Sequence, residues 1–333
     1  MAALLKKRAL AEYCQTIVEE APKPAKRLQL VRRPRTVDHS EFNVSSLETT
    51  DPLQLLPILV NLHHALPISG EAESELVPGL MKLVTDDSHP PIVVTKVLTL
   101  LAHMITTHSQ AQIIFEEVVS VTHRNKSQKV IAQGIHTACA LSQCVPPDSK
   151  MQDQVIQLAL SQFVSSTFII KVRALEAVGS LCPVEAGRMQ SAIMTTLIEH
   201  TSHQDNRVRT AAFNSLLVVQ EKGVKLLPEV YDSACLALSD DYQCVREAAL
   251  LLVKVAADSD PERLVPILDS DHHVRLIDHA FSQICNVVND ISVRVRTQAA
   301  SLLGNMTSVS ERFLQQTLDK KLMSNMRNNE CFN

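Results

Sequence analysis

The sequence is short of the residues that build tight turns and aromatic surfaces. Its 333 residues include 7 glycines, no tryptophan and 3% aromatic residues. Glycine-rich phosphate-binding loops are absent, which excludes Walker-type and dinucleotide-binding sites. Because nucleic-acid bases stack on aromatic rings, the shortage of aromatics also argues against sequence-specific RNA recognition. The remaining composition is 45% hydrophobic and mainly aliphatic, which favours an all-helical core joined by short loops.

The spacings of a metal site are also lacking. Adjacent histidines occur at His63-His64 and His272-His273, but neighbours on a helix point about 100° apart, so neither pair can converge on one ion. The cysteines show no Cys-x-x-Cys motif, and most lie in aliphatic runs, which is typical of small core residues in a reducing compartment. They are residues 14, 139, 144, 182, 235, 244, 285 and 331. We therefore expect no metal and no bound cofactor.

Membrane segments and catalytic groupings are missing as well. No apolar run reaches the length of a membrane span, and Met1–Leu5 meets Lys6 before a signal-peptide core can form. Paired acids such as Asp86-Asp87 and Asp240-Asp241 suit helix capping and turns, and nothing indicates the shared cleft that a general acid and base need. The sequence predicts a soluble, intracellular protein that is not an enzyme.

Three stretches repeat one pattern, in which an acidic turn precedes Val-Arg and then small residues. They are Asp205–Ala212, Asp240–Ala249 and Asp290–Ala300. In a helix hairpin the valine begins the second helix and packs into the seam, while the alanines let helix backbones approach closely. The arginine leaves the core and can reach the acidic turn of an adjacent repeat. The pattern predicts a stack of helical repeats that presents a long surface to partners.

Weaker copies extend the stack toward the N-terminus. Taking the valines as phase marks gives intervals of 37, 42, 36, 37 and 50 residues, and all but the last suit a repeat of about 40 residues. The long interval holds Asp258–Asp271, whose two prolines and clustered acids predict an inserted loop. The phase marks are Val93, Val130, Val172, Val208, Val245 and Val295.

Helix signals support six hairpins, so the predicted fold class is an all-α solenoid of HEAT or armadillo-like type. Asp51-Pro52 should cap and open a helix that runs to Leu66. Ser308–Glu311 resembles a capping box that starts a last helix toward Met326. The first helices of the six hairpins are expected over 72–86, 110–123, 151–165, 186–200, 226–239 and 273–289.

The repeated arginines and acids predict a ladder of ion pairs between repeats. In the early repeats Val94 and Ile131 replace the arginine, so weaker locking is expected there. His203 stands where a ladder acid is expected, five residues before Val208, which leaves Asp205 to fill that role from a shifted place. The predicted ladder comprises Arg173, Asp205, Arg209, Asp240, Arg246, Asp290 and Arg296.

Charge divides the chain into a basic head and an acidic array. Residues 1–36 carry nine Lys or Arg and three Glu, a net charge of +6. The remaining residues must carry −10 to give the total of −4. The head can be a solvated tail, a nuclear import signal or a patch that binds a polyanion. We expect a basic N-terminal helix and flexible segment over 1–50, the solenoid over 51–327 and a disordered tail over 328–333. The polyanion candidates are Lys6, Lys7, Arg8, Lys26 and Arg27.

The repeats are similar to HEAT repeats, and longer stretches resemble the N-terminal part of the Integrator complex subunit 4 family. These stretches are Met1–Arg8, Asp205–Ala212, Leu238–Tyr242 with Val245-Arg246, and Phe313–Ser324. The resemblance runs with gaps from residue 1 to about residue 327 and is weakest between about 36 and 150. Members of the family are far longer, so the chain resembles about their first third and looks truncated beside them.

The resemblance implies a non-catalytic scaffold of the nuclear Integrator complex. Its implied partners are the Integrator endonuclease subunit pair and other Integrator subunits, in 3′-end processing of small nuclear RNA and in transcription regulation. It also implies inositol hexakisphosphate as a ligand to which the basic head could contribute. Three alternatives stay open: a HEAT-type transport or phosphatase adaptor, a truncated product without the full scaffold role, and an enzyme built on helical repeats. The segment from about 200 to 323 is the part expected to engage partners.

Overall fold

The computed structural model describes residue 47 and residues 51–66, 70–104, 108–144, 150–164, 167–266 and 273–318. Almost all of the predicted head, 1–50, lies outside these ranges, as does the predicted tail, 328–333. The polyanion candidates Lys6, Lys7, Arg8, Lys26 and Arg27 therefore lie outside the described residues.

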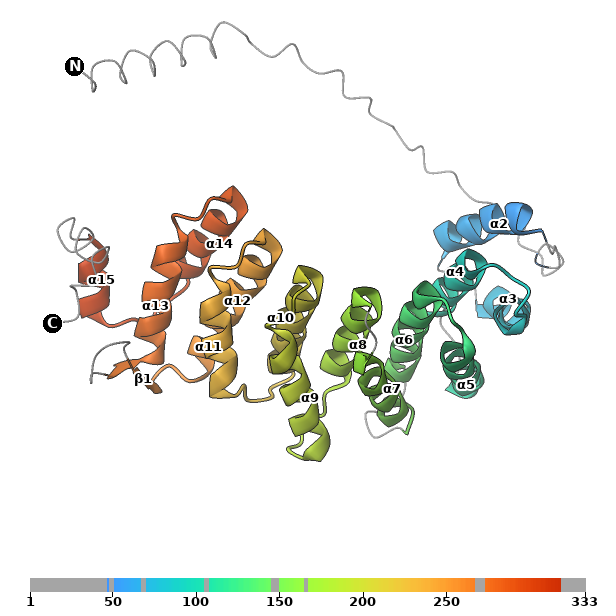
Figure 1. Ribbon diagram of the computed structural model, residues 1–333, viewed down its shortest axis with the longest axis horizontal. Coiled ribbons are helices and arrows are strands. Elements are labelled where there is room, and N and C mark those ends of the chain that lie inside the picture. The colour runs from blue at the N-terminus through green and yellow to red at the C-terminus, as the bar shows by residue number, and fades with distance from the viewer. Residues whose placement is uncertain are drawn as a thin grey trace, which may run out of the picture. The chain divides into compact units, whose positions relative to one another are not determined.

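The described chain is a series of six helix hairpins, and the predicted α-solenoid is confirmed (Figure 1). Each hairpin has a first and a second helix joined by a short polar turn. The pairs are α3 (Gly70–Thr85) and α4 (Pro91–Leu101), α5 (His108–Arg124) and α6 (Gln128–Gln143), α7 (Lys150–Ser161) and α8 (Phe168–Leu181), α9 (Arg188–His200) and α10 (Asn206–Glu221), α11 (Pro228–Ala237) and α12 (Gln243–Ser259), and α13 (Leu276–Val287) and α14 (Val293–Gly304). A 3-10 turn, η3 (Gln162–Val164), follows α7.

One helix precedes the hairpins and one follows them. Helix α2 (Pro52–Ala65) begins at the predicted cap, where the Asp51 carboxylate accepts the Leu53 backbone N–H. It packs on α4. Helix α15 (Glu311–Leu318) follows α14, and the Ser310 backbone N–H before it donates to the buried Asp278 carboxylate at 2.8 Å.

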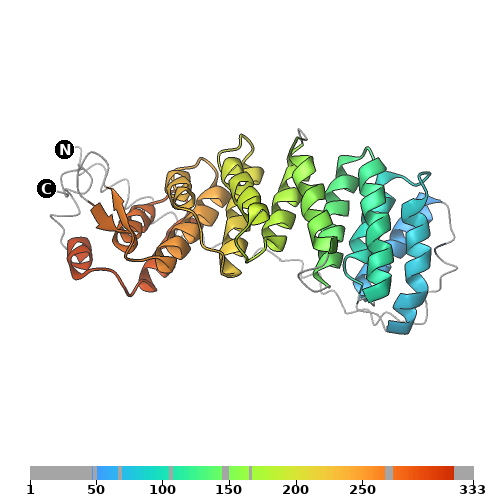
Figure 2. The same ribbon diagram turned by 90° about the horizontal axis from the view of Figure 1, so that it is seen from below.

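The two helices of each hairpin lie in separate rows. The second helices form a continuous row in which each packs on the next, from α4 to α14, with α2 at its start (Figures 1 and 2). Among the first helices, as far as the structure describes them, close packing is limited to α3 with α5 and α9 with α11. Stacking is therefore carried mainly by the second helices, and grooves can open between first helices.

The start of each second helix has the same construction. Its third residue is buried and aliphatic, and the residue after it stands at the turn that faces the next repeat. These third residues are Val93, Val130, Ile170, Val208, Val245 and Val295, each at most 3% exposed. Val172, the phase mark expected in α8, is only half-buried, so the pattern there is set by Ile170, two residues earlier.

The predicted inserted loop over Asp258–Asp271 is partly wrong. Asp258 and Ser259 still belong to α12, where the Lys254 ammonium pairs with Asp258 one turn away. After a turn at Pro261, strand β1 (Leu264–Pro266) pairs antiparallel with β2 (His273–Arg275), Val265 lying opposite Val274. The first helix of the sixth hairpin therefore begins at Leu276 and not at residue 273, because 273–275 belong to β2.

Candidate interaction surface

The turn between α9 and α10 is joined to the next repeat by Arg209. Its Nε and Nη2 atoms donate to the two carboxylate oxygens of Asp240, each at 2.8 Å. Its Nη1 donates to the backbone carbonyls of His203 and Gln204 in its own turn, at 2.8 and 3.0 Å. One guanidinium thus ties its own turn to that of the following repeat, with the fork geometry that arginine offers a carboxylate.

Arg246 repeats this arrangement one hairpin later. Its Nε and Nη2 donate to Asp290 at 2.7 and 2.9 Å, and its Nη1 donates to the carbonyls of Asp240 and Asp241. The two side chains are 6% and 9% exposed, so this pair is largely shielded from water. The hydrogen bonds from Arg246 lower the pKa of Asp290, and the same bonds raise the pKa of the guanidinium.

Arg296 has the same local geometry but only half of the contacts. Its Nη1 donates to the carbonyls of Asp290 and Ile291, at 2.8 and 3.1 Å. Within the described ranges, no carboxylate pairs with its Nε or Nη2. The structure therefore brings together two complete pairs, Arg209 with Asp240 and Arg246 with Asp290, and a third arginine fork that is open on one side.

Arg173 and Asp205, both expected in the ladder, form ion pairs within their own repeats instead. Arg173 pairs with Glu176 one turn along its own helix, at 2.7 Å. Asp205 caps α10 by accepting the Arg207 backbone N–H at 2.9 Å, and it also pairs with the Arg207 guanidinium at 2.7 Å. These bonds hold the pKa of Asp205 at about 2, chiefly through the Arg207 side chain. In the described part of the chain, neither side chain forms an ion pair with another repeat.

The residue at the ladder position of α8 is Lys171, which follows the buried Ile170. Its Nζ lies 3.2 Å from Nε2 of His203, the residue that replaces the ladder acid in the next turn. The sequence pattern did not point to Lys171, because Val172-Arg173 matches Val-Arg better than Ile170-Lys171 does. The repeat spacing indicates Ile170 as the buried position. Buried positions at 130, 170 and 208 are 40 and 38 residues apart, which is more even than the 42 and 36 residues obtained with Val172.

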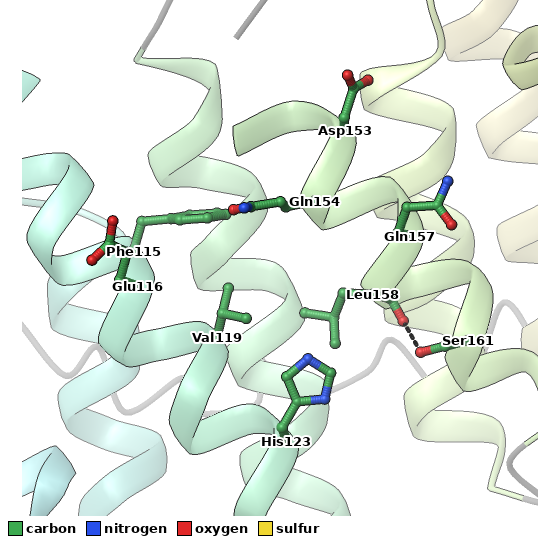
Figure 3. Close-up of a pocket in the computed structure, with 9 residues that line it drawn as sticks. All are labelled: Phe115, Glu116, Val119, His123, Asp153, Gln154, Gln157, Leu158 and Ser161. Carbon is green, nitrogen blue, oxygen red and sulfur yellow. Dashed lines mark hydrogen bonds between the residues drawn. The ribbon is translucent and has the colours of Figure 1, made fainter. Parts of the chain in front are cut away.

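A groove lies between the first helices α5 and α7 (Figure 3). Phe115, Val119 and Leu158 form its apolar floor, and Val119 and Leu158 point toward each other across it. The exposed acids Glu116 and Asp153 stand on its rim, one on each helix. Its volume is about 580 Å³, and no lysine or arginine is among the residues that line it. Its remaining lining residues are His123, Gln154, Gln157 and Ser161.

The described residues offer no metal site. In these ranges no three His, Cys, Asp or Glu side chains are grouped to hold an ion. His64 is exposed, whereas His63 is half-buried and its ring centre lies 5.4 Å from that of His103. Over the same part of the chain, no helix is both long and apolar enough to cross a membrane.

Comparison with known proteins identifies similar sequences that all carry the name Integrator complex subunit 4. No protein-family model matches the chain. Integrator complex subunit 4 of Mus musculus is 33% identical over 339 residues, which cover 98% of this chain and 34% of the mouse protein. Integrator complex subunit 4 of Drosophila melanogaster is 34% identical over 287 residues, 82% of this chain and 28% of that protein. The chain thus spans about a third of the length of the curated relatives it matches.

A solved structure supports the fold alone. The YibA protein of Escherichia coli superposes with a TM-score of 0.56 at 14% identity, over 87% of this chain and 93% of that one. The arrangement of hairpins is therefore shared with a protein of very different sequence. The sequence comparison is more specific, and it confirms the resemblance inferred from the motifs. Over nearly all of its own length, the chain is a relative of Integrator complex subunit 4.

Proposed function

We propose that the chain is a nuclear, non-enzymatic scaffold subunit of the Integrator complex. The observation that carries the proposal is the similarity to Integrator complex subunit 4 across 98% of this chain. On this proposal the repeats hold the endonuclease subunit pair and other Integrator subunits during 3′-end processing of small nuclear RNA and in transcription regulation. A stack of hairpins suits the role because it offers a long surface without needing a catalytic pocket.

The α5–α7 groove is the binding site that the proposal assigns to a protein partner. Its apolar floor can take one large aliphatic side chain, and the acids on its rim favour lysine or arginine beside that side chain. Burying an aliphatic side chain from water contributes about 1.5–3 kcal/mol. The proposed occupant is therefore a partner segment with an aliphatic anchor flanked by basic residues.

The test is purification of the tagged chain from nuclear extract, with associated proteins measured by quantitative mass spectrometry. The double variant Glu116→Lys, Asp153→Lys reverses the charge of the groove rim. A matched control, Glu199→Lys with Glu229→Lys, changes two exposed acids on α9 and α11. We expect the unaltered chain and the control to recover Integrator subunits and the groove variant to recover several-fold less. Equal recovery by all three proteins would rule out the groove, and no recovery by any would rule out the scaffold role.

A further inference from the structure

The position that holds an acid in two turns of the stack is occupied by His203 in the turn between α9 and α10. In the complete pairs, the arginine directly follows the buried third residue of a second helix. Its aspartate lies five residues before the buried third residue of the next second helix. Lys171 and His203 stand at these two positions between α8 and α10. Among the described residues, this joint therefore pairs a lysine with a histidine where the other two pair an arginine with an aspartate.

The side chains of Lys171 and His203 offer each other no hydrogen-bond acceptor when the imidazole is neutral. The backbone N–H of Asp205 donates to Nδ1 of His203 at 3.0 Å, so in the neutral ring the proton is on Nε2. The Lys171 ammonium also has only donors, and it faces that Nε2 at 3.2 Å. Among the described residues, no carboxylate accepts from either group, and the Asp205 carboxylate is held by Arg207. The Lys171 ammonium and the Nε2–H of His203 are thus two hydrogen-bond donors that face each other.

The surroundings keep the imidazole neutral and hold it in place. Burial lowers the pKa of His203, and the nearby Lys171 and His200 lower it further, against a smaller opposite effect of Asp205. The His200 ring stacks on it with centres 5.9 Å apart and planes inclined by 6°. The Arg209 guanidinium binds its backbone carbonyl. Lys171 and His203 are both half-buried, and Gln204 beside them is exposed, so the place is reachable from solvent.

We propose that Lys171 and His203 bind the carboxylate of an aspartate or glutamate supplied by a partner protein. The His203 ring fills the place that Asp240 and Asp290 take in the following turns, so the partner carboxylate would lie beside the ring and the Lys171 ammonium. One of its oxygens would accept from Nζ and the other from Nε2. A carboxylate is favoured over a phosphate because both complete pairs of the stack hold a carboxylate at this position. The inference does not depend on membership of the Integrator complex.

The test is an NMR titration of the full chain with its histidine rings labelled with nitrogen-15, at neutral pH. Sodium acetate is the probe, and sodium chloride keeps the ionic strength constant. We expect a saturable shift of the His203 ring nitrogens. The ring nitrogens of His279 should not shift and serve as a control for the fold, because His279 of α13 is hydrogen-bonded to Tyr231 of α11. The Lys171→Met variant should lose the shift.

A second variant separates binding from simple loss of structure. His203→Asp supplies the carboxylate from within the chain, so we expect its melting temperature to rise by a few degrees and to become insensitive to acetate. The proposal is overturned if the His203 nitrogens do not respond to acetate, or if they respond equally in Lys171→Met. It is also overturned if inorganic phosphate saturates the shift at much lower concentration than acetate, which would identify a phosphate site.

Discussion

At the residue scale, the arginine pairs between turns differ in how many of their donors are used. Arg246 uses all three of its guanidinium nitrogens on one carboxylate and two carbonyls, whereas Arg296 uses Nη1, which donates to two carbonyls. Because the pair of Arg246 and Asp290 is largely buried, removal of the Arg246 side chain leaves the Asp290 carboxylate buried and unpaired. The stabilising contribution of the arginine therefore depends on the following turn and not on the helix that carries it.

This difference predicts unequal effects of the same substitution. Arg246→Ala should destabilise α12 by about 3 kcal/mol, since it breaks a buried ion pair. Arg296→Ala should cost about 1 kcal/mol in α14, since only hydrogen bonds to carbonyls are lost. Amide hydrogen exchange over the two helices measures both effects. Equal losses at the two positions would show that the pairing across turns contributes little.

Asp205 gives a prediction about pH. Its folded-state pKa of about 2 lies below the ordinary value of 3.8, so the stabilisation is complete above about pH 4 and is lost as the pH falls toward 2. Asp205→Asn retains a capping side chain but cannot titrate. The difference in urea midpoint between the parent and this variant should be largest above pH 4 and should shrink toward pH 2. A difference that stays constant across this interval contradicts the assignment of the shift to the Arg207 pair.

At the scale of helices, the close approach of α8 and α10 depends on a glycine. A Cβ atom on Gly179 of α8 would lie 2.7 Å from Cβ of Ser215 on α10 and 3.1 Å from its Cα. The Ser215 hydroxyl donates to the Leu175 carbonyl at 2.9 Å, so the two second helices are joined at this place. The neighbouring serine cannot move away without losing that bond.

Gly179→Ala should therefore destabilise the α8–α10 contact by about 1–3 kcal/mol, the usual cost of overpacking a filled core. Gly304→Ala is the matched control, because a Cβ at the end of α14 would meet nothing within 4 Å. There alanine should be neutral or slightly stabilising, since it favours helix over glycine. Thermal unfolding followed by circular dichroism distinguishes them, and a harmless Gly179→Ala would mean that the helices are less tightly packed than described.

Most helices could be predicted from the sequence because the apolar period and the capping residues agree. Six hairpins, the start of α2 at Pro52 and the arginine positions in α10, α12 and α14 follow from such local patterns. Which residue of α8 takes the buried valine position could not be predicted. Val172-Arg173 matches the Val-Arg pattern, but Ile170 is the residue that is buried there. The β1–β2 hairpin was missed for a different reason, since pairing between 264–266 and 273–275 depends on two segments meeting in space.

The groove between α5 and α7 also could not be predicted from the sequence. Its floor and rim come from two helices that are not consecutive, and its opening depends on how far apart two first helices lie. The sequence placed the expected partner-binding segment at about 200–323, whereas the groove lies before it. That segment remains a prediction, and it contains both complete arginine–aspartate pairs.

At the scale of the whole molecule, the joints of the stack are not equivalent. Two joints are fixed by arginine–aspartate pairs, and the joint between α8 and α10 has Lys171 and His203 in their place. Apolar residues stand at the ladder position in α4 and α6, where Val94 is buried and Ile131 half-buried. A scaffold with fixed and less fixed joints can keep one set of surfaces in constant register while another set adapts to its partners.

We propose above that this chain holds Integrator subunits through its own helical repeats. Lysine-specific chemical cross-linking of the complex purified on the tagged chain, read by mass spectrometry, tests it most directly. The exposed Lys126 and Lys150 are close in sequence to the residues that line the α5–α7 groove. We expect cross-links from these lysines to Integrator subunits, and we expect their loss in the Glu116→Lys, Asp153→Lys variant. Recovery of the folded chain without any cross-link between its repeats and an Integrator subunit would contradict it.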